Sequence, residues 1–527
     1  MQFDYVIVGA GSAGCVLANR LSADPAVSVC LLEAGPEDRS PLIHAPAGVA
    51  AILPTRHVNW AFDTVPQPGL GGRKGYQPRG KTLGGSSSIN GMIYIRGHHS
   101  DYDDWVALGN QGWGFKDVLP YFRKSQLHHL GDSEYHGAGG ELYVGKIEAH
   151  AATHAFIEAG KQAGYRHNED FNGAEQEGIG QYEVTIRNGR RWSAAAAFLT
   201  PIRGKRENLT VLTNTLAERI LLEGKQASGV QVRLKGQSVA IKARKEVLVC
   251  AGAFGSPHLL MLSGIGPEAE LKPQGIAVQH ELPGVGQNLY DHPDAVLSYK
   301  STDNSLLGYS LGGSLKMGSA ALQYLVNRRG PLASNFAEGG GFLKTDASLD
   351  RPDIQLHSVV SILDDHNRKL HWGHGFSCHV CVLRPKSVGS VGLQSADPSA
   401  APRIDPNFLG DERDVQTLLK GYRMTREIIG QSAMARFGLK EMYGVDAHSD
   451  EQMIDLLRRR TDSIYHPIGT CKMGSDEMAV VDGQLRVHGM QNLRVVDASV
   501  MPTLVGGNTN APTIMVAERA AEWIAQA

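Results

Sequence analysis

Residues Phe3 to Leu21 read FDYVIVGAGSAGCVLANRL, and this stretch decides the fold. The apolar run Phe3 to Val8 predicts a buried strand, and it leads directly into three glycines, Gly9, Gly11 and Gly14. Beyond the glycines, small and apolar residues recur at helical spacing. The order of strand, tight turn and helix predicts the first unit of a doubly wound parallel sheet.

A second apolar run, Val29 to Leu32, ends in Glu33, nineteen residues after Gly14. In dinucleotide-binding folds the glycines let the backbone approach a pyrophosphate, which rests on the free N–H groups of the following helix. An acid about 20 residues further on hydrogen-bonds a ribose diol and repels a 2′-phosphate, which disfavours NADP. The glycine turn, with Ser12 inside it, and Glu33 therefore predict a dinucleotide site, without separating FAD from NAD.

Composition and charge narrow the class of protein. The 527 residues suffice for two large domains or about three of average size. The chain has 52 Lys and Arg against 54 Asp and Glu and lacks a basic block, so we expect no nucleic-acid partner. No apolar run has the length of a membrane-spanning helix, and since the first strand begins at once, we expect no signal sequence.

Cysteine and histidine usage adds two expectations. Six cysteines are few for this length, which suits a reduced compartment, so we expect a soluble cytoplasmic protein, attached at most peripherally to the inner membrane. The histidine pairs at 98–99 and 128–129 and the group at 371–374 lack a coherent ligand set. We expect these histidines on the surface or in loops, and no metal site.

The pattern of elements changes along the chain. Segments near 205–266 and in the last seventy residues read as strand and helix, whereas 300–460 contains alternating stretches typical of antiparallel strands. We expect an α/β chain, α+β overall, in which a second domain with a mainly antiparallel sheet is inserted into a Rossmann-like domain with a parallel sheet. The boundaries that we predict are 1–130, 201–297 and 461–527 for the nucleotide-binding domain, and 131–200 and 298–460 for the substrate-binding domain.

Three further motifs stand out. RGKTLGGSSSINGMIYIRG, residues 79–97, places small donors before an apolar segment, as a loop against a flat or anionic cofactor requires. GAFGSPHLLMLSGIG, residues 252–266, reads as a strand-to-helix turn. Near the C-terminus, IYHPIGT at 464–470 precedes a polar loop at 508–510, where Pro512 marks the start of a helix with its positive dipole end free.

Together these stretches resemble the glucose-methanol-choline (GMC) family of flavoprotein oxidoreductases, nearly end to end. The resemblance implies FAD as the cofactor and a catalytic pair formed by His466 and Asn510. Some family members tether FAD through a histidine that lies directly before the asparagine of the first signature. Ile89 occupies that position here, so we expect non-covalent FAD. The cofactor residues that the resemblance and the glycine pattern imply are Gly9, Gly11, Ser12, Gly14, Glu33, Gly84, Asn90, Met92, Asp497, Ala498, Asn510 and Thr513.

The side-chain chemistry of His466 and Asn510 is consistent with the catalytic roles that the resemblance implies. An imidazole has an ordinary pKa of about 6.5, so His466 can accept a hydroxyl proton near neutrality. Asn510 can orient the same oxygen without adding a second base. We therefore expect oxidation of a primary alcohol to the aldehyde, with electrons passed to a quinone-type acceptor or to oxygen, and with Tyr465 lining the substrate pocket.

Two other functions stay open, a hydroxynitrile-lyase-like protein with a non-redox flavin and a choline-type dehydrogenase. For choline, Glu338 is a possible anchor, although a structural role fits it as well. The apolar segment 307–330 has basic ends and can be a substrate lid, a membrane contact or a packed helix. The sequence does not specify an oligomeric state.

Overall fold

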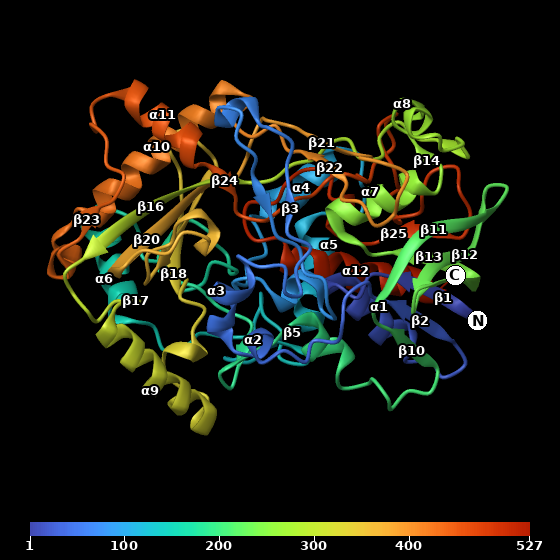
Figure 1. Cartoon of the computed structure of the whole chain (residues 1–527), viewed down its shortest axis with the longest axis horizontal. Helices are drawn as coiled ribbons and strands as arrows, with labels where there is room; N and C mark the ends of the chain where they lie inside the picture. The colour runs from blue at the N-terminus through green and yellow to red at the C-terminus, as the bar shows by residue number, and fades with distance from the viewer. Residues whose placement is uncertain (527) are drawn as a thin grey trace.

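The computed structural model describes residues 1–526, without the side chains of residues 311, 312 and 314–316. Two sheets organise it, and they lie at opposite ends of the molecule in Figure 1. The predicted combination of a Rossmann-like parallel sheet and a separate antiparallel sheet is confirmed.

The first sheet has seven strands and forms around the N-terminal apolar run. Its order is β10 (Leu209–Leu212), β2 (Val29–Leu32), β1 (Gln2–Val8), β13 (Gln237–Val249), β12 (Gln226–Leu234) and β11 (Thr215–Glu223), and β25 (Leu493–Val495) also pairs with β13. Strands β10, β2, β1, β13 and β25 run parallel, whereas β11, β12 and β13 form an antiparallel meander. The central strands are buried on both faces, which explains why they read as continuous apolar runs.

Helices cover the first sheet. α1 (Ser12–Leu21) contacts β1 and β2 and packs along α12 (Asn510–Gln526), which in turn contacts α5 (Phe115–Ser125). α7 (Gly252–Leu262) follows β13 directly and contacts β11. α4 (His99–Ala107) contacts α5, and α8 (Glu268–Leu271) contacts α7.

The second sheet has eight strands. Its order is β23 (Lys440–Glu441), β16 (Pro293–Ser301), β20 (Gly373–Val382), β19 (Ile354–Val359), β18 (Gly339–Leu343) and β7 (Gly178–Gln181), with β17 (Gly308–Tyr309) beside β20 and β24 (Asp462–Ser463) beside β16. All of its pairings are antiparallel. The predicted domain boundary at 297 therefore falls inside β16.

α6 (Ala151–Gln162) and α10 (Glu412–Ile429) contact the strands of the second sheet, and α11 (Asp450–Arg460) packs on α10. α9 (Leu311–Asn327) follows β17 and stands out from the body of the molecule (Figure 1). The remaining α-helices are α2 (Pro41–His44) and α3 (Val49–Ile52). The remaining strands among the described residues form five pairs: β3 (Phe62–Asp63) with β4 (Tyr76–Gln77), β5 (Gln126–His128) with β6 (Leu142–Val144), β8 (Ile186–Arg187) with β9 (Arg190–Arg191), β14 (Ile265–Gly266) with β15 (His280–Glu281), and β21 (Ser390–Gly392) with β22 (Arg403–Asp405). No helix among the described residues has the length and apolar character needed to cross a bilayer.

Candidate active site

A cavity of about 1090 Å³ runs from the glycine turn to the second sheet. Every motif singled out in the sequence contributes to its wall. The lining residues include Gly9, Gly11, Ser12, Glu33, Gly85, Asn90, Met92, Ala253, His357, Tyr465, His466, Asp497, Ala498, Asn508, Asn510 and Thr513.

The glycine turn has the geometry that a pyrophosphate requires. Gly9 has a φ of +103°, and a Cβ on Gly14 would lie 1.9 Å from the Gly9 carbonyl oxygen. A Cβ on Gly11 would meet nothing within 4 Å, so this position opens onto the cavity. No side chain caps α1 at Gly11, which leaves backbone N–H groups of its first turn available.

Glu33 lies beside this turn at the end of β2. One carboxylate oxygen accepts a hydrogen bond from the Ala10 N–H (3.1 Å) and the other accepts one from the Gly35 N–H (2.8 Å). Burial raises the pKa of Glu33 to about 7. A buried carboxylate has spare acceptor capacity, so these contacts fit the ribose of the FAD that the resemblance implies.

The serine-rich loop covers the turn. The Gly84 N–H donates to the Ala10 carbonyl (2.7 Å), and a Cβ on Gly85 would come within 2.7 Å of the Gly11 Cα. Asn90 Oδ1 accepts from the Met92 N–H (3.1 Å). Gly85, rather than the predicted Gly84, therefore lines the cavity, together with Asn90 and Met92.

Arg191, a buried arginine that the sequence analysis did not single out, supports this loop through hydrogen bonds. Arg191 donates to the carbonyl of Asn90 (2.6 Å) and to its Oδ1 (2.9 Å). Burial lowers the pKa of Arg191 to about 9, and no carboxylate among the described residues pairs with it.

The C-terminal segment brings two further anchors to the cavity. Asp497 accepts hydrogen bonds from the Ser256 hydroxyl (2.6 Å) and the Gly252 N–H (2.9 Å), which joins α7 to the residues before α12. The Ser12 hydroxyl donates to Asn510 Oδ1 (2.6 Å). This bond ties the first turns of α1 and α12 together, so the N-termini of two helices meet at one wall.

His466 is buried where the cavity reaches the second sheet. Its Nε2 lies 3.1 Å from Nδ2 of Asn508, and its Nδ1 lies 3.0 Å from Nδ1 of His292. Burial is the main reason why the pKa of His466 lies well below its ordinary value, and the neighbouring His292 and His357 lower it further. The ring is therefore neutral at neutral pH.

The asparagine beside His466 in the structure is Asn508, two residues before the predicted Asn510. Asn508 faces the imidazole, whereas the side chain of Asn510 turns toward Ser12. The physical reason is that α12 begins at Asn510 and points this residue at the start of α1. Gln355 of β19 donates to Asn508 Oδ1 (3.1 Å), so the Asn508 amide presents its N–H to His466 Nε2. This orientation assigns the ring lone pair to Nε2 and the proton to Nδ1.

Tyr465 lines the cavity in a strained conformation. Its φ is +75°, its hydroxyl lies 2.5 Å from Nδ1 of His366, and its carbonyl accepts from Arg79 (2.8 Å). Nε2 of His366 in turn lies 3.0 Å from Asp462. The hydroxyl of Tyr465 is thus held by His366, and the residue lines the cavity.

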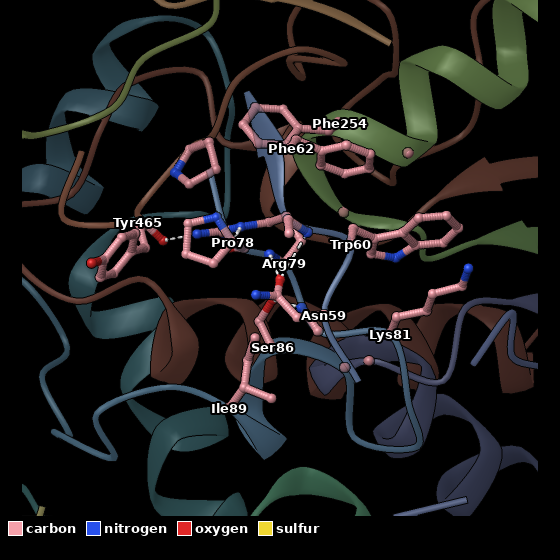
Figure 2. A pocket seen from close by; sticks show the side chains of 18 of the residues that line it. Asn59, Trp60, Phe62, Pro78, Arg79, Lys81, Ser86, Ile89, Phe254 and Tyr465 are labelled. Atoms are coloured by element: carbon pink, nitrogen blue, oxygen red, sulfur yellow. Dashed lines mark hydrogen bonds between the residues drawn. The ribbon is translucent and has the colours of Figure 1, made fainter. Parts of the chain in front are cut away.

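Aromatic and basic side chains line the arm of the cavity shown in Figure 2, where Arg79 lies between Tyr465 and the pair formed by Trp60 and Lys81. The Lys81 ammonium lies 4.1 Å from the centre of the Trp60 ring, so a cation already occupies one aromatic face. Trp60 stacks on Phe62 at 5.6 Å.

Glu338, the possible choline anchor, does not line the cavity. It is buried and accepts hydrogen bonds from the Ser334 and Thr153 hydroxyls (2.6 and 2.8 Å) and from the His150 N–H (2.6 Å). Its role is structural.

One cluster among the described residues combines possible metal ligands, His128, His136 and Glu183. His128 lies 2.6 Å from Glu183, closer than the about 3.4 Å that separates two ligands of one tetrahedral zinc. His136 lies 2.8 Å from Asp170, and the two imidazoles stack at 3.9 Å. The cluster is a hydrogen-bond network, and the expectation that His128 lies on the surface is wrong because a distant carboxylate pairs with it in the interior.

The chain is similar to known proteins over nearly its whole length. The family models described as GMC oxidoreductase match residues 3–294 and 385–517. Alcohol dehydrogenase (acceptor) of Pseudomonas putida is 47% identical over 99% of this chain and 96% of that protein. Mitochondrial choline dehydrogenase of Homo sapiens is 47% identical over 99% of this chain and 90% of that protein. The crystal structure of pyridoxine 4-oxidase from Mesorbium loti matches with a TM-score of 0.90 at 33% identity, over 100% of this chain and 99% of that one.

Proposed function

Since this chain belongs to the GMC oxidoreductase family, an FAD-dependent family of enzymes acting on CH–OH donors, we propose that it oxidises a primary alcohol to the aldehyde with His466 as the general base. The observation that carries the proposal is a neutral, buried imidazole in the cavity that begins at the glycine turn.

The residues around His466 suit proton removal. Nε2 carries the lone pair that receives the hydroxyl proton, because Nδ1 donates its proton to His292. In the structure an Asn508 N–H occupies this lone pair, so the substrate hydroxyl has to take its place on Nε2, and the released N–H then donates to the hydroxyl oxygen. FAD, when bound, supplies the acceptor for the hydride that leaves the carbinol carbon.

The cofactor-binding residues remain those expected from the sequence, with Gly85 added. Position 89, where a covalent tether would require a nucleophile, holds a buried isoleucine, which supports non-covalent binding. Arg191 would hold Asn90 and its loop in place beneath the cofactor.

A neutral alcohol fits the second-domain part of the cavity best. Among the described residues that line it between 335 and 379 and between 464 and 466, none is acidic, and Phe336, Val359, Leu363 and Ile464 are apolar. A quaternary ammonium lacks a carboxylate there, although the similarity to choline dehydrogenases keeps choline as the second candidate.

The electron acceptor is a quinone-type molecule or oxygen. The names of the relatives support this range: one is an alcohol dehydrogenase with an unspecified acceptor, and others are oxygen-dependent choline dehydrogenases.

The first test is the visible absorption spectrum of the purified protein under anaerobic conditions. We expect a yellow protein that is bleached by a medium-chain or aromatic primary alcohol and not by choline. Readmitting air then separates an oxidase, whose colour returns at once, from a dehydrogenase. A yellow protein that no alcohol bleaches would favour the lyase alternative, and a colourless protein without releasable FAD would refute the cofactor assignment.

Replacing Asn508 and replacing Asn510 should have different effects on the rate of flavin reduction and on FAD content. Asn508→Ala is expected to slow flavin reduction about tenfold or more, the scale of one lost hydrogen bond to a reacting oxygen, while FAD stays bound. Asn510→Ala removes the acceptor of Ser12 and is expected to lower FAD content with a smaller effect on the reduction rate of the flavin that remains.

Anaerobic stopped-flow reduction, normalised to bound flavin, separates these effects. Asn367→Ala, on the same cavity wall but bonded through its amide to Ala50, serves as the matched control. If Asn510→Ala slowed reduction more than Asn508→Ala at equal FAD content, the assignment of Asn508 would be wrong.

A further inference from the structure

Helix α9 projects from the second domain (Figure 1). Two residues of its described part face the protein, since Ala320 and Tyr324 are buried. The Tyr324 hydroxyl donates to the carbonyl of Gly189 (3.0 Å), which holds this side of the helix against the turn between β8 and β9.

The opposite face of α9 is apolar and exposed. Leu322, Leu325 and Val326 are 65%, 79% and 78% exposed. Their spacing of three and four residues places them side by side on one face of the helix. An exposed apolar cluster of this kind on a protruding element marks an interaction surface.

The charged residues in and around α9 indicate what kind of partner this surface binds. The segment 307–337 contains three basic residues, Lys316, Arg328 and Arg329, and no acidic one. The two arginines are exposed directly after the apolar cluster. A helix with an apolar face and basic residues beside it has the features of a segment that lies in the interface of an anionic membrane.

Further exposed residues flank the first turn of α9. Tyr309 of β17 forms a bridge with Trp372, and Leu370 follows Lys369 in the same loop. Tyr309, Leu370 and Trp372 are 47%, 61% and 68% exposed. Aromatic side chains of this type favour the membrane–water interface.

We propose that the outer face of α9, with Leu322, Leu325, Val326, Arg328 and Arg329, docks on an anionic lipid bilayer. Docking would place the loop 363–372 near the bilayer, and its residues Leu363, His366 and Asn367 line the cavity. Apolar alcohols and lipid-soluble acceptors concentrate in such a phase. The docking inference rests on the surface of α9 alone and stands whether or not the alcohol is the substrate.

The test is co-sedimentation of the FAD-loaded protein with vesicles of phosphatidylcholine, with and without about a third phosphatidylglycerol. We expect binding to the anionic vesicles that weakens as salt rises. The triple variant Leu322→Ser, Leu325→Ser, Val326→Ser should lower the partition coefficient about tenfold or more. Arg328→Gln with Arg329→Gln should weaken binding to anionic vesicles and leave any binding to neutral vesicles unchanged.

The control variant is Leu108→Ser, Leu130→Ser, Val388→Ser, which removes exposed apolar side chains elsewhere. It should bind vesicles like the original chain, and all variants should keep their FAD and their activity with a soluble dye. Failure of the original chain to bind anionic vesicles at low salt would overturn the proposal. So would equal binding by the α9 triple variant, or a dimer that this variant alone dissociates without any vesicle binding.

Discussion

Replacing His466 with alanine is expected to slow reduction of the bound flavin by alcohol about 100-fold or more, the usual scale for the loss of a general base. FAD should stay bound, because the predicted FAD-binding residues are unchanged. The measurement is anaerobic stopped-flow absorbance with saturating alcohol, which reports the reductive step alone.

Two further readouts separate a base from a structural residue. Added imidazole should restore part of the rate in the His466→Ala protein, because the space left by the side chain adjoins the cavity. Only the neutral ring accepts a proton, and the pKa of His466 lies well below its ordinary value. The reduction rate of the original chain should therefore persist as the pH falls through 6.5 and decline only when the pH reaches the lowered pKa. An unchanged rate in His466→Ala would remove this residue from the mechanism.

Replacing Gly14 with alanine should have the largest effect on stability. The new Cβ would lie 1.9 Å from the carbonyl oxygen of Gly9, and neither residue can move away easily, because Gly9 directly follows β1 and Gly14 lies within α1. We expect a loss of about 3 kcal/mol or more in the free energy of unfolding, the range of severe overpacking. The midpoint of denaturant unfolding of the apoprotein measures it.

Gly11→Ala is the matched control. Its Cβ meets no atom within 4 Å, so the apoprotein should unfold at nearly the same denaturant concentration as the original chain. FAD content should nevertheless fall, because the methyl group occupies the space where the backbone would approach the pyrophosphate. Equal stability of the Gly14 and Gly11 variants would contradict the close contact between Gly9 and Gly14.

The sequence predicted those features whose physical cause is local. The glycine turn needs only the spacing of Gly9, Gly11 and Gly14, and the alternation in 300–460 needs only a sheet with two faces. Both were confirmed in the fold. The roles of the predicted cofactor residues stay predictions.

What the sequence missed depends on contacts between distant segments. Two asparagines lie two residues apart at 508 and 510, and nothing local tells them apart. Gln355, 153 residues earlier in the chain, selects Asn508 by holding its amide toward His466. In the same way, the burial of His128 follows from its pairing with Glu183, 55 residues away.

Strand β13 lies between β1, from the beginning of the chain, and β25, close to its end. During synthesis on a ribosome, β2 becomes available to β1 early, but β1 must wait for more than two hundred residues before β13 emerges, and β13 must wait again for residues 493–495. The cavity wall runs from Val8 to Thr513, so it is complete only after residue 513 has been synthesised. The full FAD site can therefore form only after that point, and until then the nascent protein must keep its apolar strands from aggregating without the complete cofactor site.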